Sequence, residues 1–460
     1  MSTLALILCA GFIAWVYRWD HKNFPAHPRA LWVPTLWMMR CGSRGIDYWT
    51  GSIGGDRLDP IFVAIILLIG IIILLRRRIN WRFIFAQNLA LSLFYAYLMI
   101  SVSWADDLDN PAIKLFRPAT DLVMALVVLT DPAPKEAIMA VFRRTAILLI
   151  PLSVVLIRYF HDLGMMPAKN WGADIWIGVT THKNPLGQLC VVAVLAFVWS
   201  LAAAHKSGKS LLSRKVEWIY FAMCAYLFNG GGEQDSRSST AILCGIFGLM
   251  IFFVLGRMKP NIHRVGSRLA TATVVLTLTY VTMTAFDISP KALVAESQGK
   301  SPDLAGRDLI WSETIRLGLE NPIFGTGYGG FWVPAVWDKM DPGVDNHPME
   351  AHNGYIEVFA NLGLVGVGLM ILFVIQTTVG ALRTIRTDFE YGRIRLVVIG
   401  IVLLMNYSEA IFPTAVHIWW FSFLMVAYSA EPKPNLRGST SGARSGIKTV
   451  TAIHPNKAIA

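Results

Sequence analysis

The sequence has few charged residues. Only 15% of its 460 residues are Asp, Glu, Lys or Arg, while 54% are hydrophobic. A soluble domain is about a quarter charged. Apolar runs such as 61–75, 148–156 and 364–375 recur along the chain without the apolar–polar alternation of membrane barrel strands. The composition excludes an ordinary soluble domain and predicts an all-α polytopic integral membrane protein.

Metal-binding patterns are also scarce. The five cysteines lie mostly within apolar runs and form no CxxC pair, so we expect small buried hydrophobes rather than ligands or disulfides. The loops expected outside show no Asp/Glu cluster with metal-ligand spacing. The net charge of +11 is spread over short loops instead of being gathered on one domain. We therefore expect no metal, no cofactor and no nucleic-acid partner.

Apolar runs predict twelve or thirteen transmembrane helices. The expected spans are 3–17, 30–42, 59–75, 83–101, 113–130, 145–160, 184–203, 216–229, 239–256, 269–286, 353–377, 396–411 and 415–430. The first two are short, and if only one crosses, the total is twelve and the N-terminus is cytoplasmic. The expected division is N-terminal helices in 1–286, a large periplasmic loop in 287–351, C-terminal helices in 352–430 and a disordered cytoplasmic tail in 431–460.

Charge gives the orientation. Clusters of arginine and lysine occupy alternate loops, at 76–82, 206–215, 257–268 and 383–395. Basic loops remain in the cytoplasm. The loops 161–183, 230–238 and 287–351 then lie on the outer side, so polar residues from distant parts of the sequence share one membrane face. A common pocket at that face would require this arrangement.

Arg307 begins a segment in which apolar residues recur at helical spacing, including Trp311 and Ile315. A helix lying on the membrane would hold this guanidinium near headgroup height, where it could pair with a phosphate bidentately. An arginine that snorkels to lipid phosphates would give the same pattern. Trp311 is either a belt residue or a surface on which a sugar ring stacks.

His352 stands where a long apolar span begins. Asn353 is a candidate N-cap for that span, and a helix N-terminus attracts a phosphate or diphosphate. The same field disfavours a charged imidazole, so a neutral His352 could act as a general base. A surface histidine near the interface is the alternative. The glycine-rich turn 325–330 lacks the preceding strand and the Lys-Ser/Thr of a P-loop, so glycine-driven turning is the simpler interpretation.

Further polar residues lie at span ends expected on the same face. Arg237, Lys183 and Asn353 are candidate diphosphate ligands together with Arg307, and interfacial anchoring is the alternative for each basic residue. The supporting set is His182, Asn184, Glu409 and Trp311. Charged groups inside spans usually face a bundle interior or a cavity, so Glu409 could pair with an arginine of the site or orient His352.

Four segments resemble one known family. GRDLIW, IFGTGYGGFW, HNGYIEVFANLGLVG and THKNPLG are similar to the O-antigen ligase and polymerase superfamily of membrane glycosyltransferases. The early ALWVPTLWMMRCGSRGIDYW and the late NYSEAIF resemble its exopolysaccharide polymerases. The resemblance implies that Arg307 is the essential arginine of the large loop and that His352 is the essential histidine. Relatives read Ser-Lys-Thr or Ser-Arg-Thr where this chain has Ser238-Ser239-Thr240, with Arg237 just before.

The resemblance also implies an activity. It implies metal-independent, inverting transfer from an undecaprenyl-diphosphate-linked oligosaccharide at the periplasmic face of the bacterial inner membrane. Polymerisation of repeat units is the favoured form, ligation to lipid A-core is the alternative, and a chain-length regulator would be the protein partner. A transporter of lipid-linked sugar is less favoured, because the chain shows no internal repeat.

Overall fold

The computed structural model describes residues 1–24, 28–51, 57–105, 111–167, 174–206, 208, 210, 214–232, 236–258, 307–344 and 347–427. In these residues the regular elements are helices apart from two short antiparallel strands, β1 (Met165–Met166) and β2 (Ile175–Trp176). The predicted all-α membrane protein is thus confirmed. The expected span 269–286 and the tail 431–460 lie outside the described residues.

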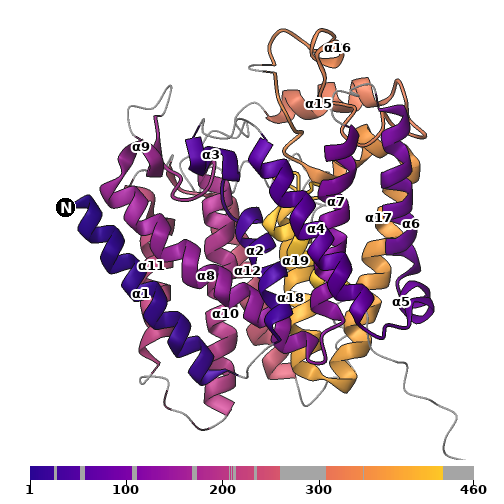
Figure 1. Ribbon diagram of the computed structural model, residues 1–460. Coiled ribbons are helices and arrows are strands. Elements are labelled where there is room, and N and C mark those ends of the chain that lie inside the picture. The colour runs from indigo at the N-terminus through magenta and orange to yellow at the C-terminus, as the bar shows by residue number, and fades with distance from the viewer. Residues whose placement is uncertain are drawn as a thin grey trace, which may run out of the picture.

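Six described helices are long and apolar enough to cross a membrane. They are α1 (Ser2–Asn23), α4 (Leu58–Arg76), α8 (Pro134–Tyr159), α10 (Lys183–Lys206), α12 (Ser239–Met258) and α17 (Gly354–Thr387). Shorter helices pack among them: α2 (Trp32–Cys41), α7 (Pro111–Leu129), α11 (Lys215–Asn229), α18 (Phe389–Met405) and α19 (Ile418–Ala427) (Figure 1). Every residue of α19 is buried, so this helix lies at the centre of the bundle.

Small elements lie at the ends of the bundle. They are α3 (Ile46–Thr50), α9 (His161–Gly164), α15 (Arg307–Gly318), α16 (Pro334–Trp337) and the 3-10 turns Arg29–Leu31, Val102–Trp104 and Gly230–Gly232. The helix expected at Arg307 is α15, and it lies above the bundle with α16 (Figure 1).

The expected span 83–101 is broken. It consists of α5 (Trp81–Gln87) and α6 (Leu89–Ser101), and the pair bends by 92° at Asn88. With this pair counted as one span, the described residues hold up to seven candidates. The prediction of twelve or thirteen spans therefore remains a prediction.

Two expected spans have different boundaries because arginine is buried in the bundle. Helix α8 begins at Pro134 rather than 145, and its Arg143 forms an ion pair with Asp20 of α1. Helix α18 begins at Phe389 rather than 396, and its Arg395 donates to the Val426 carbonyl at 2.7 Å and to Thr384 at 2.7 Å. A charge with partners inside the protein does not end a membrane helix.

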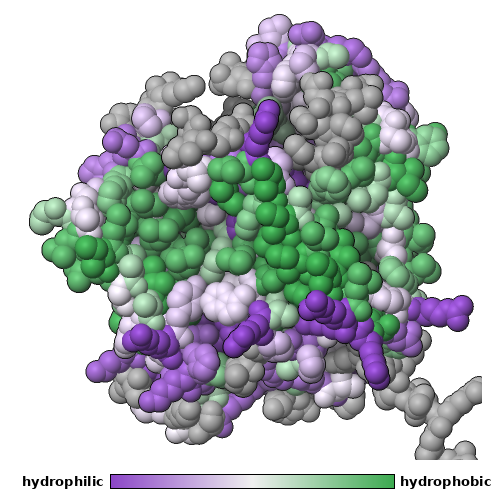
Figure 2. Space-filling model, in the orientation of Figure 1, coloured by the Kyte–Doolittle hydropathy of each residue, from purple (hydrophilic) through white to green (hydrophobic). Residues whose placement is uncertain are grey.

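The described parts of the basic loops lie at one end of the bundle. Arg77 donates to the Val127 carbonyl at 2.6 Å, Lys135 pairs with Asp388 at 2.8 Å, and Lys206 pairs with Glu390. We call this the basic end. Figure 2 shows an apolar band around the middle of the visible face with hydrophilic surface above and below it. The polar residues singled out from the sequence lie at the opposite end.

Candidate functional site

The loop between α18 and α19, residues 406–417, forms the base of the site. The Asn406 side-chain oxygen accepts from the Ile411 and Phe412 amides at 3.1 and 3.0 Å, which closes the start of the loop. The Asn406 carbonyl accepts from the Gly354 amide at 2.9 Å, so the loop also binds the first residue of α17. A Cβ at Gly354 would lie 1.9 Å from Oδ1 of Asn406. The glycine after His352 and Asn353 is thus required by close packing.

Residues of loop 406–417 hold the Arg307 side chain in place. Its guanidinium donates to the Ser408 carbonyl and lies 3.4 Å from Oε1 of Glu409. The same Oε1 accepts from Nδ2 of Asn184 at 2.7 Å. The structure therefore joins the segments GRDLIW, THKNPLG and NYSEAIF at a single carboxylate. A guanidinium has five N–H groups, so two protein contacts leave others to bind an oxyanion.

His352 has an unusual backbone conformation, with φ at +50°. Its neighbours hold it there: Ala351 accepts from the Trp311 indole at 2.8 Å and donates to Glu357 at 2.9 Å. On the other side, Asn353 caps α17 by accepting from Tyr355 and Ile356, as predicted. A non-glycine residue in the left-handed region costs about 1–2 kcal/mol, which these contacts must offset.

A carboxylate lies against the His352 imidazole. Oε1 of Glu350 is 2.7 Å from Nδ1, although the two atoms are not aligned as a hydrogen bond, and both side chains are about a third exposed. The sequence analysis did not include Glu350, although its position two residues before His352 could have suggested it. Contact at Nδ1 leaves Nε2 as the nitrogen available to a substrate proton.

Glu350, His352 and Glu409 are also close enough to hold a metal ion. Their donor atoms lie within 4.8 Å of one another. The sequence showed no such spacing because Glu409 is remote from the other two. Carboxylate oxygen and imidazole nitrogen are suitable ligands for zinc or manganese. Against this stands the Arg307 guanidinium, which already occupies Oε1 of Glu409 together with Asn184.

The glycine-rich turn is packed against backbone rather than opened toward a ligand. Gly327 donates to the Asn361 carbonyl at 2.8 Å, and Gly329 donates to the Asn361 side chain at 3.1 Å. A Cβ on Gly327, where φ is +86°, would meet the Ser101 carbonyl at 2.5 Å. Tyr328 donates to the Pro413 carbonyl at 3.2 Å, which connects the turn with loop 406–417. These contacts support the simple turning role.

Arg237 contacts a different part of the protein from Arg307. It donates to the Asn229 carbonyl at 3.0 Å and to the Asn229 side chain at 3.3 Å, at the end of α11. The nearby Thr240 contacts the site, since its hydroxyl accepts from Ser408 at 3.3 Å. The family's middle basic position corresponds to Ser239, which begins α12. The structure thus connects this motif with the site through a hydroxyl.

His182 and Lys183 stand at the start of α10. The pKa of His182 is lowered to about 4, first by burial and then by the charges of Lys183, His352 and Arg307. Burial raises the pKa of Glu409, and the positive charge of Arg307 opposes that shift. Neutral His182 and the carboxyl group of Glu409 therefore both lie near Arg307. Asn184 connects the start of α10 with loop 406–417 through its hydrogen bond to Glu409.

A buried carboxylate missing from the sequence analysis organises the wall of the site. Glu357 of α17 accepts from the Trp332 indole at 2.8 Å and from the Asn361 amide at 2.9 Å, in addition to Ala351. It thus joins the turn containing Trp332 to the segment that carries His352. Its spacing on the first turn of a helix gave no signal that separated it from a surface glutamate.

Residues 233–371 match the family model described as O-antigen ligase. The resemblance to the O-antigen ligase and polymerase superfamily is confirmed over this region. The matched segment contains Arg237, Arg307, the glycine-rich turn and His352. The chain is also similar to "Exopolysaccharide production protein ExoQ" of Rhizobium meliloti (strain 1021), at 24% identity over 226 residues. That match covers 47% of this chain and about half the length of the relative, 49%.

Proposed function

We propose that the protein is a membrane glycosyltransferase that joins oligosaccharide repeat units carried on an undecaprenyl diphosphate, at the periplasmic face of the inner membrane. The observation that supports this most is the pairing of Arg307 with Glu409 and Asn184 beside His352. A fixed cation can stabilise a leaving diphosphate, and an imidazole next to a carboxylate can act as a general base. The similarity to an exopolysaccharide production protein supports a polymerase.

Arg307 would bind the diphosphate and stabilise its charge as it leaves, an electrostatic effect that typically contributes several kcal/mol to catalysis. His352, whose Nδ1 lies 2.7 Å from Oε1 of Glu350, would accept the acceptor hydroxyl proton at Nε2. Attack opposite the diphosphate would invert the anomeric centre. Lys183 and Arg237 would supply further positive charge near the headgroup, and a chain-length regulator would act as a partner.

A ligase is the second candidate, because the matching family model is described as O-antigen ligase. The donor chemistry would be the same, and lipid A-core would be the acceptor. A transporter of lipid-linked sugar would instead leave its cargo at the inner face when Arg307 is replaced. In cells, an Arg307→Ala variant of an enzyme should accumulate lipid-linked repeat units at the outer face.

The deciding experiment uses purified protein in nanodiscs with a lipid-diphosphate oligosaccharide as the only substrate. We expect a ladder of multiples that persists in EDTA and disappears in His352→Ala. Single transfer that needs lipid A-core would identify a ligase. Activity lost in EDTA and restored by a divalent cation would assign the Glu350, His352 and Glu409 cluster to a metal. No transfer to either acceptor would reject the glycosyltransferase proposal.

A further inference from the structure

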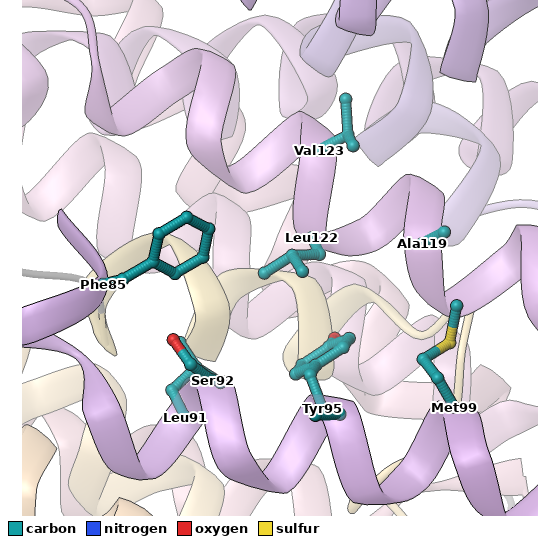
Figure 3. A pocket seen from close by; sticks show the side chains of 9 residues that line it. Phe85, Leu91, Ser92, Tyr95, Met99, Ala119, Leu122 and Val123 are labelled. Atoms are coloured by element: carbon teal, nitrogen blue, oxygen red, sulfur yellow. The ribbon is translucent and has the colours of Figure 1, made fainter. Parts of the chain in front are cut away.

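A lateral groove opens between α6 and α7, away from the candidate site. It has a volume of about 260 Å³. Its lining comes from α5, α6 and α7: Phe85, Leu91, Ser92, Tyr95, Ala96, Met99, Ala119, Leu122 and Val123. Figure 3 shows Tyr95 and Met99 of α6 facing Leu122 and Ala119 of α7 across open space. Among the described elements, α6 packs mainly on α17, while α7 packs mainly on α4 and α19.

The groove presents hydrocarbon almost throughout. Its floor is aromatic, since the Tyr95 ring stacks on Trp420 of α19 with centroids 6.1 Å apart. The hydroxyl of Ser92 donates to the Asn88 carbonyl of its own helix at 3.0 Å. A saccharide here would lose its hydrogen bonds to water without finding enough new ones. The suitable occupant is an apolar chain.

The groove lies at membrane depth and runs along the bundle. Its inner end is at Phe85, which follows the basic loop 76–82, and its outer end is at Met99. Phe85 and Ala96 are exposed on the outside of the protein, so a lipid can enter from the side. Such an opening suits a molecule that diffuses within the bilayer.

The outer end of the groove leads toward the candidate site. Two residues beyond Met99, the Ser101 hydroxyl accepts from the Tyr328 amide at 3.1 Å, and Tyr328 contacts Pro413 in loop 406–417. On α7, Lys114 donates to the Gly329 carbonyl at 3.0 Å. Lys114 thus places a positive charge beyond this end of the groove, while Arg117 on the same helix lies 3.6 Å from the Asp59 carboxylate. The glycine-rich turn therefore lies between the groove and Glu409.

From this continuity we propose that the groove binds the isoprenoid chain of the lipid-diphosphate donor and so guides the diphosphate toward Arg307. The proposal rests on the proposed function and adds the residues that select the lipid. A branched, unsaturated chain would pack its methyl groups against Tyr95, Leu122 and Val123. Bulk phospholipid is the competing occupant that an experiment has to separate.

The kinetic test fills the groove without touching the site. Ala96→Phe should raise the KM for a long-chain polyprenyl donor about fivefold or more and leave the KM for a short-chain analogue unchanged. Leu93→Phe is the matched control, because Leu93 is 47% exposed on the same helix but does not line the groove. Equal effects of Ala96→Phe on long and short donors would overturn the proposal. Melting temperatures in detergent identify a variant that fails to fold.

A binding measurement keeps this test separate from the proposed function. A diazirine-bearing polyprenyl diphosphate without sugar should label the α6 and α7 peptides that contain Met99 and Ala119. Unlabelled polyprenyl diphosphate should compete, and phosphatidylglycerol should not. Equal competition by phosphatidylglycerol would mean that the groove holds bulk lipid. If the wild-type protein transfers no sugar, the proposed function fails, while this labelling still decides what the groove binds.

Discussion

Glu409 shares one carboxylate oxygen between a cation and an amide, and this limits the charge that Arg307 can offer a substrate. The Glu409→Gln variant keeps an acceptor for Asn184 and removes the negative charge beside Arg307. On the proposed mechanism we expect the donor KM to fall about fivefold, since roughly 1 kcal/mol of Coulomb energy gives that ratio. The kcat should fall as well, because the diphosphate product leaves more slowly.

Steady-state kinetics with a varied donor concentration measure both effects. Glu320→Gln is the matched control, because Glu320 forms an exposed pair with Lys339 at 2.7 Å in the same outer segment. It should leave both constants unchanged. An unaltered donor KM in Glu409→Gln would show that the charge of Glu409 does not act on the diphosphate.

His182 gives a prediction about pH. Its pKa is about 4 in the folded protein against an ordinary value of 6.5, so the unfolded chain binds the proton more readily. Stability contributed by neutral His182 is present above pH 6.5 and is lost as the pH falls toward 4. We expect a loss of about 1–2 kcal/mol after allowing for solvent screening.

The His182→Gln variant should therefore lose less folding stability than the wild type as the pH falls. Thermal unfolding in detergent between pH 7 and pH 4 gives the comparison, and the exposed His161→Gln serves as the control. If the wild type and His182→Gln lose stability in parallel over this range, His182 is not held neutral by the fold.

Sequence reasoning identified single residues well where the signal was local. The Asn353 cap follows from the residue type before an apolar run, and its two hydrogen bonds confirm it. The pairing of Glu409 with a site arginine was one of two predictions and is the one observed. The partners Glu350, Ser408 and Thr240 were missed. Ser408 and Thr240 contact residues that are far away in the sequence, and such contacts cannot be read from a single sequence.

At the scale of elements, two of the glycines in α17 differ in whether their position tolerates a side chain. Gly363 interrupts the helix with φ at +62°, and a Cβ there would meet the Ile323 carbonyl at 2.4 Å. Gly368 is exposed, and a Cβ there would meet nothing within 4 Å. Gly363→Ala should therefore lower the free energy of unfolding by about 2 kcal/mol or more. Gly368→Ala should raise it by about 0.5–1 kcal/mol.

Chemical or thermal unfolding of both variants in the same detergent makes this comparison directly. The two substitutions are identical and five positions apart on one helix, so detergent effects cancel. Equal stability of the two variants would mean that the break at Gly363 relaxes without cost, and that the glycine-rich turn is not fixed by it.

Elements were predictable where an apolar run coincided with a helix, as in α4, α10 and α12. Elements were not predictable where charged side chains are buried inside the bundle. Arg395 was placed in a basic loop and Arg143 lies before the expected start of its span, yet each is nearly fully buried with partners from another helix. The bend at Asn88 was also missed, because hydropathy averages over a short polar break.

For the whole molecule, the orientation in the membrane follows from which charged groups lie at which end of the bundle. Pairs such as Lys135 with Asp388 lie at the basic end, while Asn184 with Glu409 lies at the other. From the positive-inside rule we expect the basic end to face the cytoplasm, and on the proposed function the candidate site then faces the periplasm. A lipid-linked substrate displayed outside would meet the site directly.

Labelling with a membrane-impermeant maleimide tests this orientation. In right-side-out spheroplasts we expect Lys339→Cys to react at once, since Lys339 is exposed near the site. Arg78→Cys, which is exposed at the basic end, should react only after permeabilisation. The wild-type protein gives the background from its five native cysteines. The opposite pattern would place Arg307 and His352 in the cytoplasm, where a periplasmic polymerase could not use them.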